Sequence, residues 1–314
     1  MNGLEAHIQI SHEVSSSLKT GWPVVALEST VIAHGLPHPV NVETALELED
    51  TIRKSRAIPA TIAVLDGVIR VGLTKEEIER LAGDRDNILK LGARDLPAAL
   101  AAKKDGATTV SATSFIASKV GIEVFVTGGM GGVHHGASRT LDISSDLWEL
   151  AHSGVIVVCA GAKAILDLPA TLEWLETHQV PVFGYGTEEF PGFYSRKTGL
   201  WIERVDTPEE VADRFLIQRD IGMRSGMVVG VPIPAEHELR VGDPISEALV
   251  EAERRNIKGK DVTPWVLAHL SEMTAGKTVA SNIALLKNNA AVGAEIAKAL
   301  AFRRQIEKGA REIV

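Results

Sequence analysis

The stretch Val155-Ile156-Val157-Val158-Cys159-Ala160-Gly161-Ala162-Lys163 decides the fold class of this 314-residue chain. Its first half is a short apolar run rich in β-branched residues, and a glycine follows closely. This pattern is typical of a strand that is buried on both faces of a parallel sheet. A helical pattern over residues 164–177 follows directly. A strand followed at once by a helix is the building unit of α/β proteins.

The same alternation is present on both sides of this stretch. The sequence predicts strands over residues 22–27, 60–65, 88–91, 122–127, 155–159, 182–184 and 227–231. It predicts helices over residues 42–55, 75–81, 96–104, 114–120, 145–152, 164–177 and 208–219. Residues 68–71, close behind the turn pair Asp66-Gly67, predict a short hairpin strand. We therefore expect a three-layer α/β/α sandwich with a mostly parallel mixed central sheet.

The last quarter of the chain predicts helices alone, over residues 245–255, 263–273 and 278–313. The third of these contains Asn288, Asn289 and Gly293, which are weak helix formers, so we expect it to be bent or divided. No linker, repeat or low-complexity tract separates these helices from the sheet region. We therefore expect one domain over residues 1–314 with a helical C-terminal layer.

The charge balance argues against two classes of partner. The chain has 33 Lys and Arg against 41 Asp and Glu, a formal net charge of −8. General binding of nucleic acid or of an anionic membrane surface needs a cationic face. No apolar stretch approaches the roughly 20 residues of a membrane span. The single Cys159 cannot form an internal disulfide, so we expect a cytoplasmic protein.

Chemically useful residues follow several of the predicted strands. Ligands of open α/β sheets bind beyond the carboxyl ends of the strands. Glu28 comes directly after one strand, and Lys90 lies at the end of another. A glycine-rich loop over residues 127–136, with His134 and His135, follows a third, and Lys163 follows a fourth. We expect these groups to meet at one rim of the sheet.

Two of these features also have plain structural interpretations. A carboxylate after a strand, such as Glu28, often caps a helix or is solvated in a loop. The glycine loop lacks the Gly-Lys-Ser/Thr of a P-loop and the glycine spacing of a dinucleotide fold. Its glycines either let the chain turn or present N–H groups to an anion.

Lys163 favours a chemical role. A helix that starts near Ala162 would place its positive N-terminus beside the amine. That field, together with burial, would lower the lysine pKa. A neutral lysine can attack a carbonyl and form a Schiff base. The alternative is a surface lysine in a first helical turn, where cations are disfavoured.

A second polar segment has the sequence Asp142-Ile143-Ser144-Ser145-Asp146. If it is helical, its two carboxylates share one face. Oxygen ligands of this kind suit Mg²⁺ or Mn²⁺, which keep most of their waters. Asp142 or Ser144 as the N-cap of the helix over residues 145–152 fits the spacing equally well. Asn282 could reach the same rim from the last helix, or cap a break in it.

Several longer segments together identify a known family. They are residues 24–30, 94–97, 127–134, 157–163, 190–196, 232–234, 263–264 and 281–285. On these segments the chain closely resembles the pseudouridine-5'-phosphate glycosidase, or indigoidine synthase A-like, family. The resemblance runs from about residue 10 to about residue 300 of the numbering used here.

The resemblance implies an activity, a cofactor and an assembly. The activity is reversible cleavage of the C–C glycosidic bond of pseudouridine 5'-phosphate to uracil and ribose 5-phosphate. The cofactor is one Mn²⁺ per subunit, with Mg²⁺ as a substitute, and the assembly is a homotrimer with the α/β/α fold.

The resemblance also implies roles for individual residues. Glu28 matches the proton donor, Lys163 the lysine nucleophile and Asp142 the metal-site aspartate. The positions that match substrate contacts or other pocket residues are Lys90, Val110, Ser144, Ser145, Asp146, Thr127, His134 and Asn282.

Two departures from the family pattern concern the entrance and the phosphate end. His135 stands where the family commonly has Arg, and residues 37–41 are Pro-His-Pro-Val-Asn instead of Pro-Tyr/Phe-Pro-Gln-Asn. Two other functions use some of the same residues. A Schiff-base aldolase acting on a sugar phosphate would share Lys163, and a sugar-phosphate sensor would bind without turnover.

Overall fold

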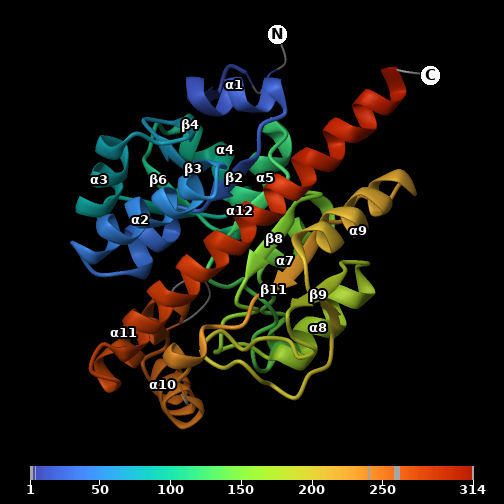
Figure 1. Ribbon diagram of the computed structural model, residues 1–314. Helices are drawn as coiled ribbons and strands as arrows, with labels where there is room; N and C mark the ends of the chain where they lie inside the picture. Colours follow the sequence, from blue (N-terminus) through green and yellow to red (C-terminus); the bar gives the residue numbers. More distant parts are fainter. Residues whose placement is uncertain (1–2, 4, 240, 258–261, 313–314) are drawn as a thin grey trace.

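The computed structural model describes residue 3 and residues 5–239, 241–257 and 262–312. An 11-stranded sheet runs through the molecule (Figure 1). Along its main path the strand order is β1-β4-β3-β2-β7-β8-β11-β9-β10, and β5 and β6 pair beside β3. The strands are β1 (Ile8–Ile10), β2 (Val24–Leu27), β3 (Ile58–Leu65), β4 (Val68–Val71), β5 (Leu89–Leu91), β6 (Gly106–Thr108), β7 (Val124–Val126), β8 (Ile156–Cys159), β9 (Val182–Tyr185), β10 (Glu203–Val205) and β11 (Met227–Gly230).

The sheet is mostly parallel, as the sequence predicted. The antiparallel pairs are those that β3 makes with β4 and with β6. The first half of β3 pairs with β2 and its second half with β4, so this long strand joins the two parts of the sheet. All of the predicted strands are present, including the hairpin strand β4. Strands β1, β6 and β10 were not predicted from the sequence.

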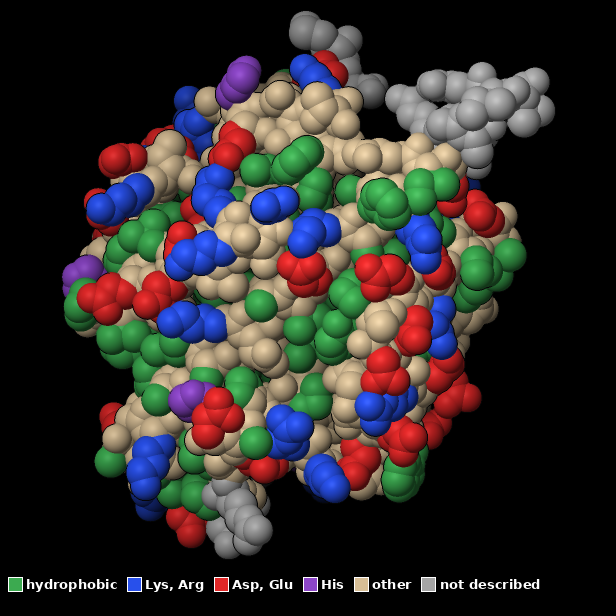
Figure 2. Space-filling view, in the orientation of Figure 1, with side chains coloured by type: hydrophobic (Ala, Val, Ile, Leu, Met, Phe, Trp, Pro, Cys, Tyr) green, Lys and Arg blue, Asp and Glu red, His purple; other side chains and the backbone are tan. Residues whose placement is uncertain are grey.

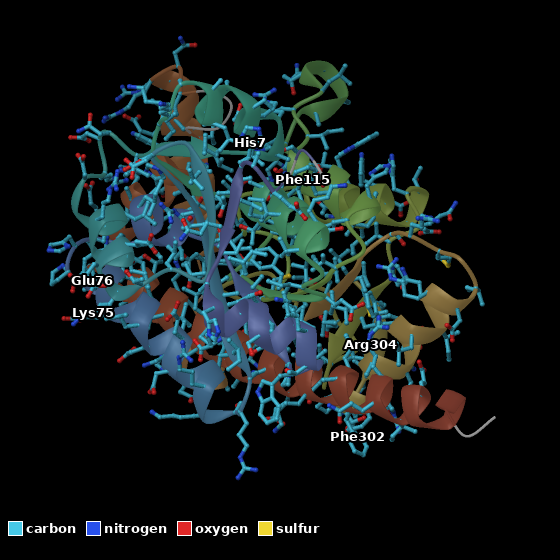
Figure 3. All side chains as sticks on the ribbon, turned by 90° about the horizontal axis from the view of Figure 1, so that it is seen from above. His7, Lys75, Glu76, Phe115, Phe302 and Arg304 are labelled. Atoms are coloured by element: carbon cyan, nitrogen blue, oxygen red, sulfur yellow. The ribbon has the colours of Figure 1, made fainter. Side chains whose placement is uncertain are left out.

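Helices cover both faces of the sheet, which confirms the three-layer architecture. Helices α2, α9 and α12 lie on one face and α5 and α7 on the other (Figures 1 and 3). The helices are α1 (His12–Thr20), α2 (Val40–Lys54), α3 (Lys75–Gly83), α4 (Leu96–Ala101), α5 (Val110–Val120), α6 (Ala137–Thr140), α7 (Ser145–His152), α8 (Leu168–Thr177), α9 (Pro208–Asp220), α10 (Gly242–Arg254), α11 (Val262–Met273) and α12 (Lys277–Glu312).

One predicted helix begins later than expected. The helical pattern over residues 164–177 starts only at Leu168, because the Asp167 side chain accepts a hydrogen bond from the Ala170 N–H at 3.0 Å and caps the helix there. Pro169 then occupies the first turn, where its missing N–H costs nothing. Lys163 therefore lies outside the helix, in the segment between β8 and α8.

The expected break in the last helix is also wrong, since α12 continues unbroken through its 36 residues. Gly293 faces the sheet, where a Cβ would lie 2.2 Å from Val126 Cγ2, so glycine lets the helix lie directly on β7. Asn289 is fully buried beside it. These weak helix formers therefore serve tertiary contacts. Residue 313, the predicted end of the helix, lies outside the described residues.

The core explains the apolar runs in the sequence. All residues of β2, β8 and β11 are buried, as expected for strands covered on both faces. On the face shown in Figure 2, acidic and basic side chains are interspersed. In the described part of the chain, no helix combines the length and apolar character needed to cross a bilayer.

Candidate active site

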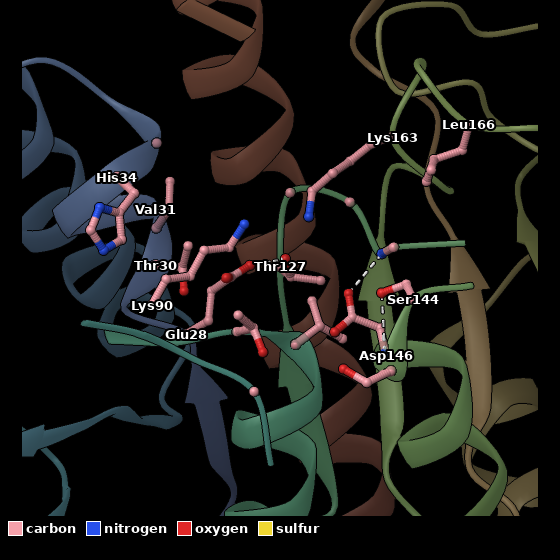
Figure 4. A pocket seen from close by; sticks show the side chains of 18 of the residues that line it. Glu28, Thr30, Val31, His34, Lys90, Thr127, Ser144, Asp146, Lys163 and Leu166 are labelled. Atoms are coloured by element: carbon pink, nitrogen blue, oxygen red, sulfur yellow. Dashed lines mark hydrogen bonds between the residues drawn. The ribbon is translucent and has the colours of Figure 1, made fainter. Parts of the chain in front are cut away.

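A pocket of about 440 Å³ lies beyond the carboxyl ends of β2, β7 and β8 (Figure 4). This is the edge of the sheet at which the sequence predicted a site. Segments far apart in the chain, from β2 to α12, contribute to its wall. All eleven candidate residues line it: Glu28, Lys90, Val110, Thr127, His134, Asp142, Ser144, Ser145, Asp146, Lys163 and Asn282.

Glu28 lines this pocket and comes immediately after β2. The Thr127 hydroxyl, from the end of β7, donates a hydrogen bond to its carboxyl group. Burial raises the pKa of Glu28, although the nearby Lys163 and Lys90 amines oppose the rise. A carboxyl group with a raised pKa holds a proton nearer to neutral pH, so Glu28 is suited to proton transfer.

The two amines approach Glu28 from different elements. Lys90 extends from β5, and Lys163 from the segment after β8 (Figure 4). The Lys163 N–H donates to the Met130 carbonyl at 3.0 Å, which ties this segment to the glycine loop. The expectation that a helix N-terminus acts on Lys163 is wrong, because α8 begins only at Leu168. The lysine is held instead by an extension of the β7–β8 pairing.

Asp146 is a buried carboxylate of the pocket, and its surroundings differ from those of the half-buried Glu28. Its Oδ1 accepts the Ser111 N–H and its Oδ2 accepts the Gly131 N–H, both at 2.8 Å. The Ser144 hydroxyl oxygen accepts the Asp146 N–H at 3.2 Å and caps α7. Of the two interpretations for this segment, the N-cap is therefore confirmed. Asp142 lies before the helix begins, so the shared helical face for the two carboxylates is wrong.

The glycine-rich loop is closely packed. A Cβ on Gly131 would lie 2.2 Å from Ser144 Oγ, and one on Gly129 would lie 2.5 Å from Phe193 Cδ2. Several of its N–H groups already have acceptors within the protein. The Met130 N–H donates to Gly161 O and the Gly131 N–H to Asp146 Oδ2. The Val133 N–H donates to Thr171 Oγ1 and the His134 N–H to Asp142 O. The loop thus uses these N–H groups to hold its own shape, and they are not open to an anion.

Asp142 lies at the rim of the pocket and is partly exposed. The neighbouring His134 has its pKa lowered by burial, although Asp142 acts in the opposite direction. Among the described residues, no group of three or more His, Cys, Asp or Glu side chains is arranged to hold a metal ion. One partly exposed carboxylate fits a hydrated Mn²⁺ or Mg²⁺ that keeps most of its waters, and it does not fit a cage of protein ligands.

The pocket also contains residues that the sequence did not single out as site residues. His34 comes from the short π-helix Val31–Gly35, and Leu267 and Leu286 come from the C-terminal helices. Phe193 contributes an aromatic wall and has a left-handed backbone with φ of 64°. Phe193 lies in one of the segments that carry the family resemblance, which was the available signal for it.

Neither departure from the family pattern lines the pocket. His135 is exposed beside the loop, and residues 37–41 lie beyond the lining residue Gly35. Asn41 is buried and donates to the Ile32 carbonyl at 2.8 Å, so it supports the π-helix from behind. The altered residues His38, Val40 and His135 therefore do not contribute to the wall of the pocket.

Comparison with known proteins places the chain in a clear group. Residues 13–299 match the family described as Indigoidine synthase A like protein. A relative from Clostridium botulinum, named pseudouridine-5'-phosphate glycosidase, is 52% identical over 298 residues, which cover 94% of this chain and 97% of the relative. A relative of the same name from Escherichia coli K12 is 50% identical over 295 residues, covering 93% and 95%.

Two solved structures share the fold. An indigoidine synthase A-like protein from Thermotoga maritima has a TM-score of 0.86 and 39% identity, covering 94% of this chain and 97% of that one. The prealnumycin C-glycosynthase AlnA, solved in complex with ribulose 5-phosphate, has a TM-score of 0.88 and 35% identity, covering 95% and 98%.

Proposed function

Because the chain belongs to the indigoidine synthase A-like family, we propose that it reversibly cleaves the C–C glycosidic bond of pseudouridine 5'-phosphate. The products are uracil and ribose 5-phosphate. One observation carries the proposal beyond the relatives' names: a carboxyl group with a raised pKa lies below two amines in one pocket. This combination provides both a proton donor and an amine nucleophile.

The substrate explains why both groups are needed. Ordinary glycoside hydrolysis with two carboxylates depends on a heteroatom leaving group, which a C-nucleoside lacks. The bond between ribose C1' and uracil C5 breaks only if C5 gains a proton and C1' can carry electron deficiency. A nitrogen attached to C1' stabilises that positive charge better than a bare oxocarbenium does. An amine nucleophile is therefore better suited to this bond than a second carboxylate.

The residues can perform the reaction in a balanced sequence. The Lys163 amine bonds to C1' while Glu28 gives its proton to the ring oxygen, which opens the ribose. The nitrogen of the Lys163 adduct then returns a proton to the Glu28 carboxylate, and Glu28 passes it to uracil C5. The C1'–C5 bond breaks with its electron pair staying on uracil, and a protonated imine remains between C1' and Lys163. Water hydrolyses this imine to ribose 5-phosphate, the released proton goes back to Glu28, and the neutral lysine is restored.

The phosphate end of the substrate is assigned to Lys90. A cationic side chain on β5 lies within the same pocket as Lys163, so binding of the phosphate there would position C1' against the nucleophile. The other residues of the wall that match the family's substrate contacts are assigned to the same role: Val110, Thr127, His134, Ser144, Ser145, Asp146 and Asn282. Asp142 would hold a hydrated Mn²⁺ or Mg²⁺, which supplies positive charge near the substrate. A homotrimer and a cytoplasmic location belong to the same proposal.

The central experiment measures uracil release from pseudouridine 5'-phosphate, with and without Mn²⁺. Release of uracil and ribose 5-phosphate supports the proposal, whereas turnover only of aldol-type donors would assign the chain to the aldolases. Binding of the substrate without any turnover would assign it to the sensors. Pseudouridine without its phosphate should be a much poorer substrate.

Reduction with borohydride tests the imine. In the presence of ribose 5-phosphate it should add one sugar-phosphate mass to the peptide that contains Lys163, and Lys163→Met should abolish the label. Lys197→Met, which removes an exposed lysine outside the pocket, is the matched control and should label like the parent. Label on another lysine, or none despite turnover, contradicts the mechanism. Light scattering on the purified protein tests the trimer.

A further inference from the structure

Asn289 lies on α12 and is fully buried, and it is not part of the pocket wall. Its Nδ2 donates to the Thr127 carbonyl at 2.9 Å and to the Gly128 carbonyl at 3.4 Å. Its Oδ1 finds no donor among the described residues. A buried acceptor without a donor is costly. The two hydrogen bonds from Nδ2 to carbonyl oxygens therefore account for the amide at this position, since its Oδ1 forms none.

The orientation of this amide follows from its partners. Two carbonyl oxygens face the same end of the side chain, and carbonyl oxygens only accept hydrogen bonds. The NH₂ group must therefore face them, because the flipped amide would place an oxygen against two oxygens.

The two carbonyls belong to the backbone that carries the chemistry. The Thr127 N–H donates to the Val158 carbonyl at 3.0 Å, and its hydroxyl donates to Glu28. The Gly128 carbonyl also accepts the Ala160 N–H at 2.9 Å, on the segment that leads to Lys163. Asn289 thus holds the point at which the proton-donor side and the amine side of the pocket meet.

The helix can reach this point because small residues allow a close approach. Gly293, one turn after Asn289, leaves no room for a Cβ above Val126. A Cβ on Gly128 would contact Asn282 and Leu285 of α12 at 3.3 Å. The helix and the turn after β7 are therefore in direct contact, and a change at Asn289 acts on Thr127 without an intermediary.

We propose that Asn289 is a positioning residue, which holds the Thr127 hydroxyl against Glu28 and so keeps the proton donor in its working geometry. The inference rests on the proposed function, since it concerns the proton donor of that reaction. The charged groups near Glu28 are Lys163, Lys90 and Asp146, which come from other elements.

The first test compares Asn289→Leu with Asn288→Leu. Leucine has a similar size but no donor, and Asn288 is a matched control because it lies next to Asn289 and donates to Pro232 O at 3.2 Å, away from the pocket wall. We expect Asn289→Leu to lower kcat about 10- to 100-fold with KM within a few-fold, since a misplaced catalytic group can cost about that much. Asn288→Leu should stay within a few-fold of the parent. Equal kcat losses in the two variants overturn the proposal.

The second test asks whether Asn289 acts through Thr127. Thr127→Val removes the hydroxyl, and the double variant combines it with Asn289→Leu. If the proposal is right, the double variant is no slower than Thr127→Val alone, because the hydroxyl that Asn289 positions is already absent. Multiplied losses mean that Asn289 acts by another route, and the proposal is wrong. Should Asn289→Leu fail to fold, Asn289→Ala removes the donor without adding bulk and serves in the same cycle.

The third test needs no turnover. The carboxyl absorption of Glu28 can be followed against pH by infrared difference spectroscopy between each protein and its Glu28→Gln variant. The Thr127 hydrogen bond lowers the pKa of Glu28 against the effect of burial, so Asn289→Leu should move the titration to higher pH. An unchanged titration in folded Asn289→Leu overturns this inference alone. A parent that does not release uracil overturns the proposed function alone.

Discussion

The two sides of the pocket each contain a carboxyl group, and the two groups have different partners. On the β2 and β7 side, Glu28 accepts a hydrogen bond from the Thr127 hydroxyl, and burial raises its pKa. On the α7 side, Asp146 accepts two backbone N–H groups, from Ser111 and Gly131. The partner of Glu28 is thus a hydroxyl, which can rotate and exchange a proton. The partners of Asp146 belong to the rigid backbone.

The difference lies in the chemistry of the partners. A hydroxyl can donate to a carboxylate and accept from a carboxylic acid, so it serves Glu28 in both protonation states. A backbone N–H can only donate, so both oxygens of Asp146 must act as acceptors. Asp146 therefore keeps both hydrogen bonds only as an ionised carboxylate. Asp146 thereby joins α5, the glycine loop and α7 around the pocket. The role proposed for Glu28 is proton transfer, whereas the contacts of Asp146 hold the frame of the pocket beside its proposed contact with substrate, and the following predictions test this distinction.

The largest effect is expected for Glu28→Gln. The amide keeps the shape of the side chain but cannot transfer a proton, so kcat should fall about 10²–10⁴-fold while the melting temperature is retained. Glu49→Gln is the matched control. Glu49 is likewise a half-buried glutamate, accepts a hydrogen bond from a threonine hydroxyl (Thr61, 2.6 Å) and has a pKa raised by burial, but it lies outside the pocket wall. Steady-state kinetics decide the point: equal rates for Glu28→Gln and the parent exclude Glu28 as the proton donor.

Asp146→Asn should act on stability. An amide offers one oxygen to two N–H donors and turns its own NH₂ toward one of them, so a buried backbone donor is left without an acceptor. That loss should lower the free energy of unfolding by about 1–3 kcal/mol. Asp95→Asn is the control, because Asp95 is partly exposed and accepts a single N–H, from Gly92 at 2.9 Å. Urea denaturation that finds Asp146→Asn as stable as the parent contradicts a structural role.

Asp142 is a third carboxylate, at the rim of the pocket, and its proposed role is to bind a metal ion. A variant at this position therefore tests metal binding apart from proton transfer by Glu28 and the structural contacts of Asp146. We expect chelation to suppress uracil release and added Mn²⁺ to restore it. Asp142→Ala should raise the Mn²⁺ concentration needed for half-maximal activity by about tenfold, the lower end of what outer partners contribute to metal affinity. Titration of activity with Mn²⁺ measures this shift. Full activity of the chelated parent would show that the reaction needs no metal.

The smallest effect is on the pH dependence of stability. The pKa of Glu28 in the folded protein lies above its ordinary value of 4.5, so the folded state binds this proton more tightly than the unfolded state does. Its stabilising effect is complete below pH 4.5 and is lost as the pH rises through the folded-state pKa. The free energy of unfolding should therefore fall less with rising pH in Glu28→Gln than in the parent. The midpoints of urea denaturation of the two proteins, measured from pH 4.5 upward, test this prediction. If the midpoints of both proteins change with pH in the same way, the raised pKa of Glu28 is contradicted.

The sequence by itself determined the layers and the edge at which the site lies. Short β-branched runs such as residues 156–159 form strands because they can be buried on both faces. The carboxyl-end rule is then sufficient to bring Glu28 and Lys163, which follow the parallel strands β2 and β8, to one edge of the sheet, where the pocket lies. Lys90 reaches the same pocket from β5, which runs antiparallel to β2 because β6 pairs antiparallel with β3, so its place depended on the tertiary structure. Residue types at strand ends carry this information locally, so a pattern is sufficient to find them.

Only the tertiary structure decided how those residues are held. Four features depend on the tertiary structure and on groups far apart in the chain. They are the start of α8 at Leu168, the unbroken course of α12, the two N–H partners of Asp146 and the contact of Asn289 with Thr127. Asn289 and Gly293 are poor helix formers by local propensity, yet they lie in a continuous helix because packing against β7 outweighs a propensity difference of about 1 kcal/mol or less per residue. A local sequence pattern contains the helix propensity of each residue. It does not contain the tertiary hydrogen bonds and packing contacts that override this propensity, because these form between segments that are distant in the sequence.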